Sequence, residues 1–116
     1  MKFGEWGEMV AGRYLEDQGY RILERNFRCR SGEIDLIVQK GDLLCFVEVK
    51  TRKGTYTGYP SEAVTRNKQE HIRRVTSYYL HTHRGTHWKY LRMDVIEVLR
   101  LGETTYLRHI EDAFGE

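Results

Sequence analysis

The sequence has 116 residues, of which 40% are hydrophobic and 31% charged, and its formal net charge at pH 7 is +2. This length and composition predict one globular domain over residues 1–116. No apolar run approaches the roughly 20 residues that span a bilayer, and the first residues lack the apolar core of a signal peptide. These features argue against a membrane or secreted protein and favour a cytoplasmic one. In that compartment Cys29 and Cys45 are expected as free thiols, with a disulfide as the alternative.

Hydrophobic periodicity and turn residues predict seven elements in the order α-β-β-β-α-β-β. Trp6, Val10 and Tyr14 recur at helical spacing before Gly19, which ends that helix. The predicted helices cover residues 4–18 and 66–83, and the predicted strands cover 20–28, 33–39, 43–51, 90–99 and 104–110. A loop is expected over 54–60 and a helical turn over 61–64. The fold class is therefore α/β, with a central mixed β-sheet that contains an antiparallel hairpin and is flanked by helices.

The two clearest strands form a hairpin whose turn sets the register. Gly41-Asp42 is a two-residue turn with glycine at its first central position. In this register Asp35 lies opposite Glu48, and Glu33 lies opposite Lys50. Directly opposed side chains share a face, so one end of one face gathers three carboxylates and a lysine. The other face is apolar and consists of Ile34, Leu36, Val38, Leu43, Cys45, Val47 and Val49.

The opposed carboxylates of Asp35 and Glu48 repel each other, and an unpaired charge in or near a core is costly. Lys50 can neutralise one of them, and a divalent cation can neutralise both. Mg²⁺ (or Mn²⁺) favours a few carboxylate oxygens and keeps positions open for a phosphate and for the water that attacks it. A lysine beside the ion can orient or deprotonate that water. The spacing therefore predicts a phosphodiesterase site, and an exposed strand end with a Glu–Lys pair remains the alternative.

The 19 basic residues include 13 arginines, and arginine is the side chain best suited to forked contacts with phosphate. Several of the basic residues form three clusters along the chain, which are Arg25, Arg28 and Arg30; Lys50, Arg52 and Lys53; and Arg66, Lys68, Arg73 and Arg74. A single charged cluster is usually a solvated face, but three clusters in one small domain favour a polyanionic partner. The residues expected to contact nucleic acid are Arg52, Lys53, Arg66, Lys68 and Arg73.

Residues 32–37 (GEIDLI) and 46–52 (FVEVKTR) resemble the Asp…Glu-x-Lys core of the restriction-endonuclease-like nucleases, the PD-(D/E)xK superfamily. More narrowly, the chain resembles the bacterial UPF0102 family, which is similar to archaeal Holliday junction resolvases. Further matching segments are Gly7-Glu8, Tyr14-Leu15, residues 19–26, Glu62-Ala63-Val64, Lys68-Gln69, Arg92-Met93-Asp94-Val95 and residues 109–114. The resemblance implies a restriction-endonuclease-like core, and the sequence departs from the family pattern at none of the Asp, Glu and Lys positions.

The resemblance also implies a role for each matched residue of the hairpin. Asp35 and Glu48 are the implied Mg²⁺ ligands, with the backbone carbonyl of Val49 as a third protein ligand. Lys50 is implied to act on the attacking water. These assignments make Asp35, Glu48 and Lys50 the catalytic core.

Two helix residues complete the site that the resemblance implies. Glu8 corresponds to a first-helix glutamate that approaches the metal, although a solvated helix glutamate is the alternative. Gln69 corresponds to a helix glutamine that supports the catalytic core, with a capping or surface role as the alternative. Asp94 also matches the family pattern, and a nearby arginine is as good a partner for it as a metal. The pair His81-x-His83 lacks a further ligand nearby, so a zinc site is not expected there.

The expected function is a Mg²⁺-dependent endonuclease that hydrolyses phosphodiester bonds in DNA, with branched or otherwise structured DNA as the implied substrate. Two alternatives stay open, which are a nuclease fold that binds nucleic acid without cutting it and an RNA-processing nuclease. No aromatic platform with readable base contacts separates RNA from DNA in this sequence. Because a four-way junction has two-fold symmetry and paired cuts need two sites, a resolvase-like role implies a homodimer.

Overall fold

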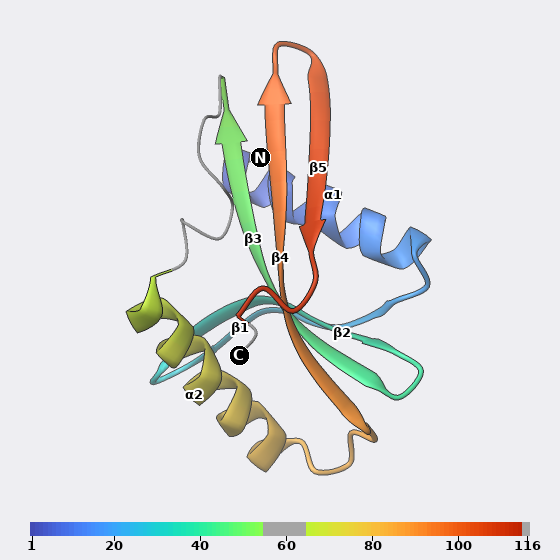
Figure 1. The fold of residues 1–116 in the computed structure, drawn as a ribbon, viewed down its shortest axis with the longest axis vertical. Helices are drawn as coiled ribbons and strands as arrows, with labels where there is room; N and C mark the ends of the chain where they lie inside the picture. Colours follow the sequence, from blue (N-terminus) through green and yellow to red (C-terminus); the bar gives the residue numbers. More distant parts are fainter. Residues whose placement is uncertain (55–64, 115–116) are drawn as a thin grey trace.

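A computed structural model shows an open five-stranded mixed sheet with one helix against each face (Figure 1). It describes residues 1–54 and 65–114. The elements in chain order are α1 (Phe3–Asp17), β1 (Arg21–Cys29), β2 (Gly32–Lys40), β3 (Leu43–Lys53), α2 (Arg66–Thr82), β4 (Tyr90–Leu101) and β5 (Thr104–Ile110). This confirms the predicted order. Strands β3 and β4 each end two residues later than predicted. Residues 55–60 of the expected loop and the helical turn over 61–64 lie outside the described residues.

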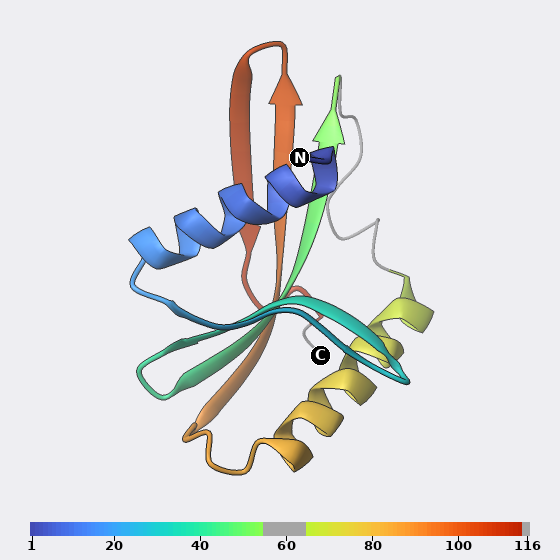
Figure 2. The ribbon, with the colours of Figure 1, turned by 180° about the vertical axis from the view of Figure 1, so that it is seen from behind.

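The strands lie side by side in the order β1-β2-β3-β4-β5. The pairs β1–β2, β2–β3 and β4–β5 are antiparallel, whereas β3 and β4 run parallel. Parallel neighbours need a crossover connection, and α2 lies within the connection between them. Figure 2 shows α1 crossing the near side of β3, β4 and β5, while α2 lies on the far side of the sheet. The predicted α/β class with a mixed sheet is therefore confirmed.

Helices on both faces leave the central strands with two apolar sides, which explains why β2 and β3 read as nearly continuous hydrophobic runs. The core on the α1 side consists of Ala11, Leu15, Tyr20, Leu36, Val38, Cys45, Val47, Val49, Ile96 and Val98. The core on the α2 side consists of Ile34, Ile37, Leu44, Phe46, Ile72, Val75, Tyr79, Val95 and Phe114. Both cysteines are free thiols, as expected, and neither described helix is long and apolar enough to cross a bilayer.

The hairpin turn sets the register that the sequence predicts. Gly41 has φ +58°, a conformation that glycine adopts without strain. Lys40 pairs with Leu43, and the ladder continues to the pair of Leu36 and Val47. One further step along both strands brings Asp35 and Glu48 to the end of this ladder.

The prediction that Ile34 shares a face with Leu36 is wrong, because Ile34 packs in the α2-side core. The two faces of β2 exchange at Asp35. On the neighbouring strand, Asn26 lies opposite Asp35 and has φ +51°, a left-handed conformation that asparagine tolerates better than most residues. The left-handed backbone at Asn26 interrupts the regular alternation of side chains between the two faces of the sheet. Asp35 therefore lies at the point where the side chains of β2 change faces.

Helix α1 lies directly against β3 next to this point. A Cβ atom at Gly7 would lie 2.2 Å from Oγ1 of Thr51, much closer than any normal contact. Glycine therefore allows the backbone of α1 to approach the residue that follows Lys50. The first turns of α1 are held beside the charged end of the hairpin.

Candidate metal centre

The two predicted ligands lie where β2 and β3 separate. Backbone pairing between these strands ends at Leu36 and Val47. Beyond this pair, the side chain of Asp35 accepts a hydrogen bond from the backbone of β3. Its Oδ2 accepts a hydrogen bond of 2.8 Å from the backbone N–H of Val49. Asp35 is 8% exposed and Glu48 is 7% exposed, so both carboxylates are withdrawn from water.

Glu48 carries an unfavourable charge in this position. Burial, together with the Asp35 carboxylate beside it, raises the pKa of Glu48 to about 7. Its Oε2 is buried and has no hydrogen-bond partner among the described residues. A buried acceptor without a partner is uncommon in folded proteins and calls for an explanation. A cation between Asp35 and Glu48 satisfies both observations, so the donor set fits a hard divalent metal.

Two lysines face the carboxylate pair. The Nζ of Lys68, in the first turn of α2, lies 3.3 Å from Oε1 of Glu48. Burial and the neighbouring ammonium of Lys68 lower the pKa of Lys50. Burial works against the charge of Lys68 as well, but Lys50 and the two carboxylates together raise its pKa. Both lysines therefore lie close enough to the acid pair for their charges to interact with it.

Glu8 and Gln69 lie on the two helices beside this pair. Burial and the charge of Asp35 raise the pKa of Glu8, and a hydrogen bond from the side chain of Asn26 offsets part of that rise. Among residues 1–54 and 65–114, however, no three His, Cys, Asp or Glu side chains lie close enough to hold a metal together. Glu8 is close enough to Asp35 for the two charges to interact, and its role as a metal ligand stays a prediction. Gln69 is half-buried in the first turns of α2, and its supporting role stays a prediction.

Glu33 does not pair with Lys50, which corrects the prediction made from the hairpin register. It lies opposite Arg28 on β1, and Nε of Arg28 donates to its Oε2 at 2.7 Å. The reason is that β2 leaves β3 at Asp35 and continues only against β1. The charged end of the hairpin face thus divides into an acid pair with lysines and a separate exposed ion pair.

The five predicted nucleic-acid contacts are spread over the molecule. Lys68 lies in the site, and Arg66 is exposed at the start of α2. The Nε of Arg52 lies 3.9 Å from Glu97, and Nζ of Lys53 lies 5.2 Å from the ring centre of Phe3. Arg73 donates to the carbonyl oxygen of Phe114 at 3.2 Å, so it holds the end of the described chain. The geometry brings only Lys68 of these five to the acid pair.

Glu97 is a site neighbour that the sequence analysis did not single out. It lies beside Lys50 in the parallel register of β3 and β4, is 2% exposed, and has an Oε2 without a hydrogen-bond partner among the described residues. A glutamate inside the apolar run of residues 95–99 was the available signal. The crossover that brings β4 beside β3 was needed to place it next to Lys50.

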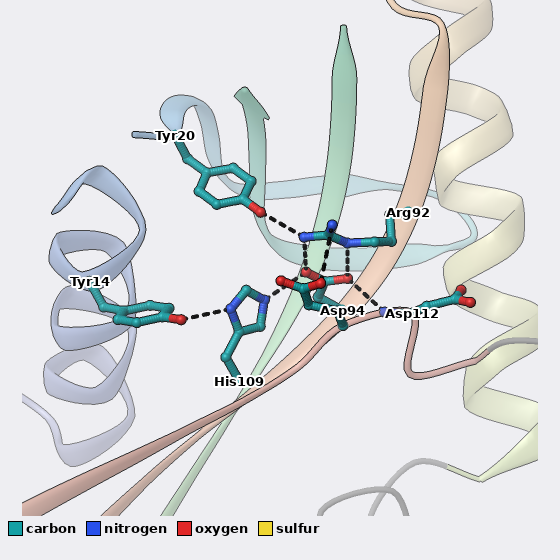
Figure 3. A network of polar contacts seen from close by, with 7 residues as sticks. Tyr14, Tyr20, Arg92, Asp94, His109 and Asp112 are labelled. Atoms are coloured by element: carbon teal, nitrogen blue, oxygen red, sulfur yellow. Dashed lines mark hydrogen bonds and ion pairs between the residues drawn. The ribbon is translucent and has the colours of Figure 1, made fainter. Parts of the chain in front are cut away.

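Asp94 lies in a separate polar network (Figure 3). Arg92 donates to both of its oxygens at 2.8 and 2.9 Å, and His109 contacts Oδ2 at 2.7 Å. Burial alone would raise the pKa of Asp94, but the hydrogen bonds from His109 and Arg92 lower it to about 2. The network continues from His109 to Tyr14 on α1 at 2.9 Å and from Arg92 to Tyr20 at 2.6 Å.

This saturation settles the role that the sequence left open for Asp94. The backbone N–H of Asp112 adds another hydrogen bond of 3.0 Å to its Oδ1. The carboxylate is fully buried and its charge is already balanced by an arginine. Asp94 therefore ties α1, β5 and the C-terminal segment to β4, as an arginine-paired aspartate rather than a metal ligand.

By its fold the molecule is an α/β protein built on an open mixed sheet, with an acid pair and a lysine at the charged end of its central hairpin.

Residues 7–98 match the model of a family described as "Uncharacterised protein family UPF0102". The relatives that match the chain include three with the name UPF0102 protein. That of Symbiobacterium thermophilum is 52% identical over 97 residues, 84% of this chain and 81% of its own. That of Alkaliphilus oremlandii is 48% identical over 115 residues, 97% of both chains. That of Caldicellulosiruptor saccharolyticus is 46% identical over 97 residues, again 84% and 81%. The chain belongs to the UPF0102 family.

Proposed function

We propose that this protein is a metal-dependent endonuclease that hydrolyses phosphodiester bonds in DNA at the pair of Asp35 and Glu48. The observation that carries the proposal is Glu48, a buried carboxylate beside a second one, with a pKa of about 7 and an oxygen without a hydrogen-bond partner among the described residues. Strongly perturbed carboxylates beside a lysine are typical of functional sites. The resemblance of the hairpin to the Asp…Glu-x-Lys core supports the same reaction.

Asp35 and Glu48 would hold Mg²⁺ or Mn²⁺, and the backbone of Val49 is fixed beside Asp35 by its hydrogen bond. When bound, such an ion polarises the phosphoryl oxygen and lowers the pKa of a water molecule. The Val49 N–H holds Asp35 in one orientation, which leaves its other oxygen for a ligand. The two acids therefore form a preorganised pair that a cation relieves of repulsion.

Lys50 acts on the proton of the attacking water. Its pKa is lowered by burial and by Lys68, so its amine accepts a proton more readily near neutral pH than a free lysine does. After the attack, the resulting ammonium stabilises the extra negative charge on the phosphorus oxygens. Lys68 supplies a second positive charge, with its Nζ 3.3 Å from Oε1 of Glu48.

Branched DNA is the substrate that the resemblance to junction resolvases favours. Two symmetric cuts in a four-way junction require two copies of this site, so the proposal includes a homodimer. A cytoplasmic location, where chromosomal DNA is accessible in bacteria, is consistent with this substrate.

The proposal is tested with purified protein, a four-way junction and matched linear DNA. We expect cleavage with Mg²⁺ or Mn²⁺, no cleavage with EDTA, and a loss of at least about 100-fold in Lys50→Ala, because general-base catalysis is typically worth that much. Lys89→Ala is the matched control, since Lys89 is an exposed lysine 3.9 Å from Asp42 at the turn end of the hairpin. DNA binding that is indifferent to Mg²⁺, with no cleavage, would instead identify a non-catalytic binding module.

A further inference from the structure

A cleft of about 260 Å³ lies between the first turns of α2 and the start of β2. We propose that this cleft binds the phosphate group of the DNA backbone, held by Lys68, His71 and Asn67. The proposal rests on the proposed nuclease function and adds the phosphate-binding residues to it. Its walls are formed chiefly by Gly32, Glu33, Glu48, Asn67, Lys68 and His71.

The cleft adjoins the acid pair directly. Glu48 forms part of its wall, and the Lys68 ammonium, 3.3 Å from Oε1 of Glu48, lines the same space. The buried Oε2 of Glu48 has no hydrogen-bond partner among the described residues, so the cleft wall contains a carboxylate oxygen that can accept the proposed metal ion. A phosphate in the cleft therefore lies beside the proposed metal position, as hydrolysis requires.

The α2 wall presents donors that suit an anion. Asn67 and His71 are four residues apart and lie on the same side of the helix, with Lys68 beside them. The first turn of α2 contains no acidic residue, and Thr65 caps it by accepting a hydrogen bond from the N–H of Lys68 at 3.1 Å. The partial positive charge of this helix start is therefore not offset by an acidic side chain in its first turn.

The opposite wall neither fills the cleft nor repels an anion strongly. Gly32 has φ +144°, and a Cβ there would point towards Val75 and His71, at 3.5 and 3.9 Å. Glycine thus leaves only backbone at this position. Glu33 is the negative residue of this wall, and the guanidinium of Arg28 neutralises it at 2.7 Å.

Lys68 has two anionic partners in this arrangement, Glu48 and the phosphate. A cation held by Glu48 competes with Lys68 for that carboxylate, which leaves the ammonium available for the phosphate. Removing the Lys68 charge is therefore expected to weaken phosphate binding without weakening Mg²⁺ binding. A purely structural role of Lys68 would change both in the same direction, so the two affinities distinguish the roles.

The test uses the full chain, ¹⁵N-labelled, with inorganic phosphate and thymidine 5′-monophosphate as probes in the presence of Mg²⁺. Chemical-shift changes are expected at Gly32, Asn67, Lys68 and His71. We expect Lys68→Gln to weaken the Kd about tenfold and His71→Ala about threefold to tenfold, whereas Lys68→Arg stays within about threefold of wild type. His81→Ala, a second exposed histidine on α2, is the matched control and should leave the Kd unchanged.

Absence of binding by wild type up to about 10 mM of either probe, shifts confined to another surface, or unchanged affinity in both Lys68→Gln and His71→Ala would overturn the phosphate site. Calorimetry of Mg²⁺ with Lys68→Gln gives the second readout, and weaker metal binding there would contradict the competition between Lys68 and the metal. Phosphate binding as described in a protein that cuts no DNA would refute the nuclease and leave the cleft assignment intact. DNA cleavage with phosphate bound elsewhere would do the opposite.

Discussion

Replacing Glu48 by glutamine is expected to stabilise the metal-free protein at alkaline pH. In the folded chain Glu48 has a pKa of about 7, above its ordinary value of 4.5. Between those values the folded state holds a proton that the unfolded state has released, so stability falls as pH rises. Above pH 7 the buried carboxylate is charged beside Asp35, and the full penalty is present. Glutamine keeps the shape of the side chain and removes the charge.

The size of the effect follows from the pKa difference. Each pKa unit corresponds to about 1.36 kcal/mol, so a rise from 4.5 to about 7 sets an upper bound of about 3 kcal/mol. Glu48→Gln also removes the negative partner of Lys68, which takes back part of the gain. We expect a net increase in the free energy of unfolding of roughly 1–3 kcal/mol at pH 8, falling to about zero at pH 4.5.

Urea unfolding of both proteins at pH 4.5, 6 and 8 in EDTA measures this difference. Adding Mg²⁺ at pH 8 should stabilise wild type and leave Glu48→Gln almost unchanged, because binding to the native state alone adds stability. Glu33→Gln is the matched control, since its carboxylate is paired with Arg28 and lies outside the acid pair. A Glu48→Gln protein that is less stable than wild type at pH 8 in EDTA would refute the reasoning.

Three further predictions concern the elements that hold the site in place. Gly7→Ala should destabilise the fold by about 1–3 kcal/mol, because its Cβ would lie 2.2 Å from Oγ1 of Thr51. Gly4→Ala is the control, because the space around its Cβ is open, and it should be neutral or stabilising by up to about 1 kcal/mol. Thermal unfolding of the two variants compares these effects. Thr65→Ala should cost about 1 kcal/mol by removing the α2 cap, and an unchanged melting temperature would contradict that role. Asp94→Asn should cost about 3 kcal/mol at neutral pH, because it removes the charge of a fully buried carboxylate that contacts Arg92 and His109. The pKa of Asp94 is about 2 when folded and 3.8 otherwise, so its charge stabilises the fold above about pH 4, and acid unfolding should show the two proteins converging as pH falls to 2.

The sequence predicted the element order and the hairpin register because both depend on local signals. The Gly41-Asp42 turn fixes which residues of β2 and β3 face each other, and Gly19 marks the end of α1. These features involve residues close together in the chain. The register that brings Asp35 and Glu48 to the same end of the hairpin therefore follows from the amino-acid sequence alone.

The sequence did not predict where β2 leaves β3. The left-handed backbone at Asn26 and the use of the Asp35 side chain as an acceptor for Val49 depend on the neighbouring strand. This separation moves Ile34 to the α2 side and gives Glu33 to Arg28 instead of Lys50. A sequence pattern that assumes regular alternation of side chains cannot predict such a change of face.

Contacts between distant segments were also beyond the sequence patterns. Lys68 was grouped with other basic residues as a nucleic-acid contact, but the crossover through α2 places its ammonium beside Glu48. The same crossover brings Glu97 next to Lys50. Both placements depend on the parallel pairing of β3 with β4, which no local pattern of charge or hydrophobicity encodes.

The measurement that tests the central claim most directly is cleavage of a panel of linear, nicked, flapped and four-way DNA, with RNA counterparts, by wild type, Asp35→Asn and Lys50→Ala. The account predicts that wild type with Mg²⁺ or Mn²⁺ cuts at least one DNA of the panel and that both variants are at least about 100-fold slower while remaining folded. Lys89→Ala should cut like wild type, because that exposed lysine lies 3.9 Å from Asp42 at the turn end of the hairpin. Cleavage that persists in Asp35→Asn, or a wild type that cuts none of the DNA substrates, would contradict the account.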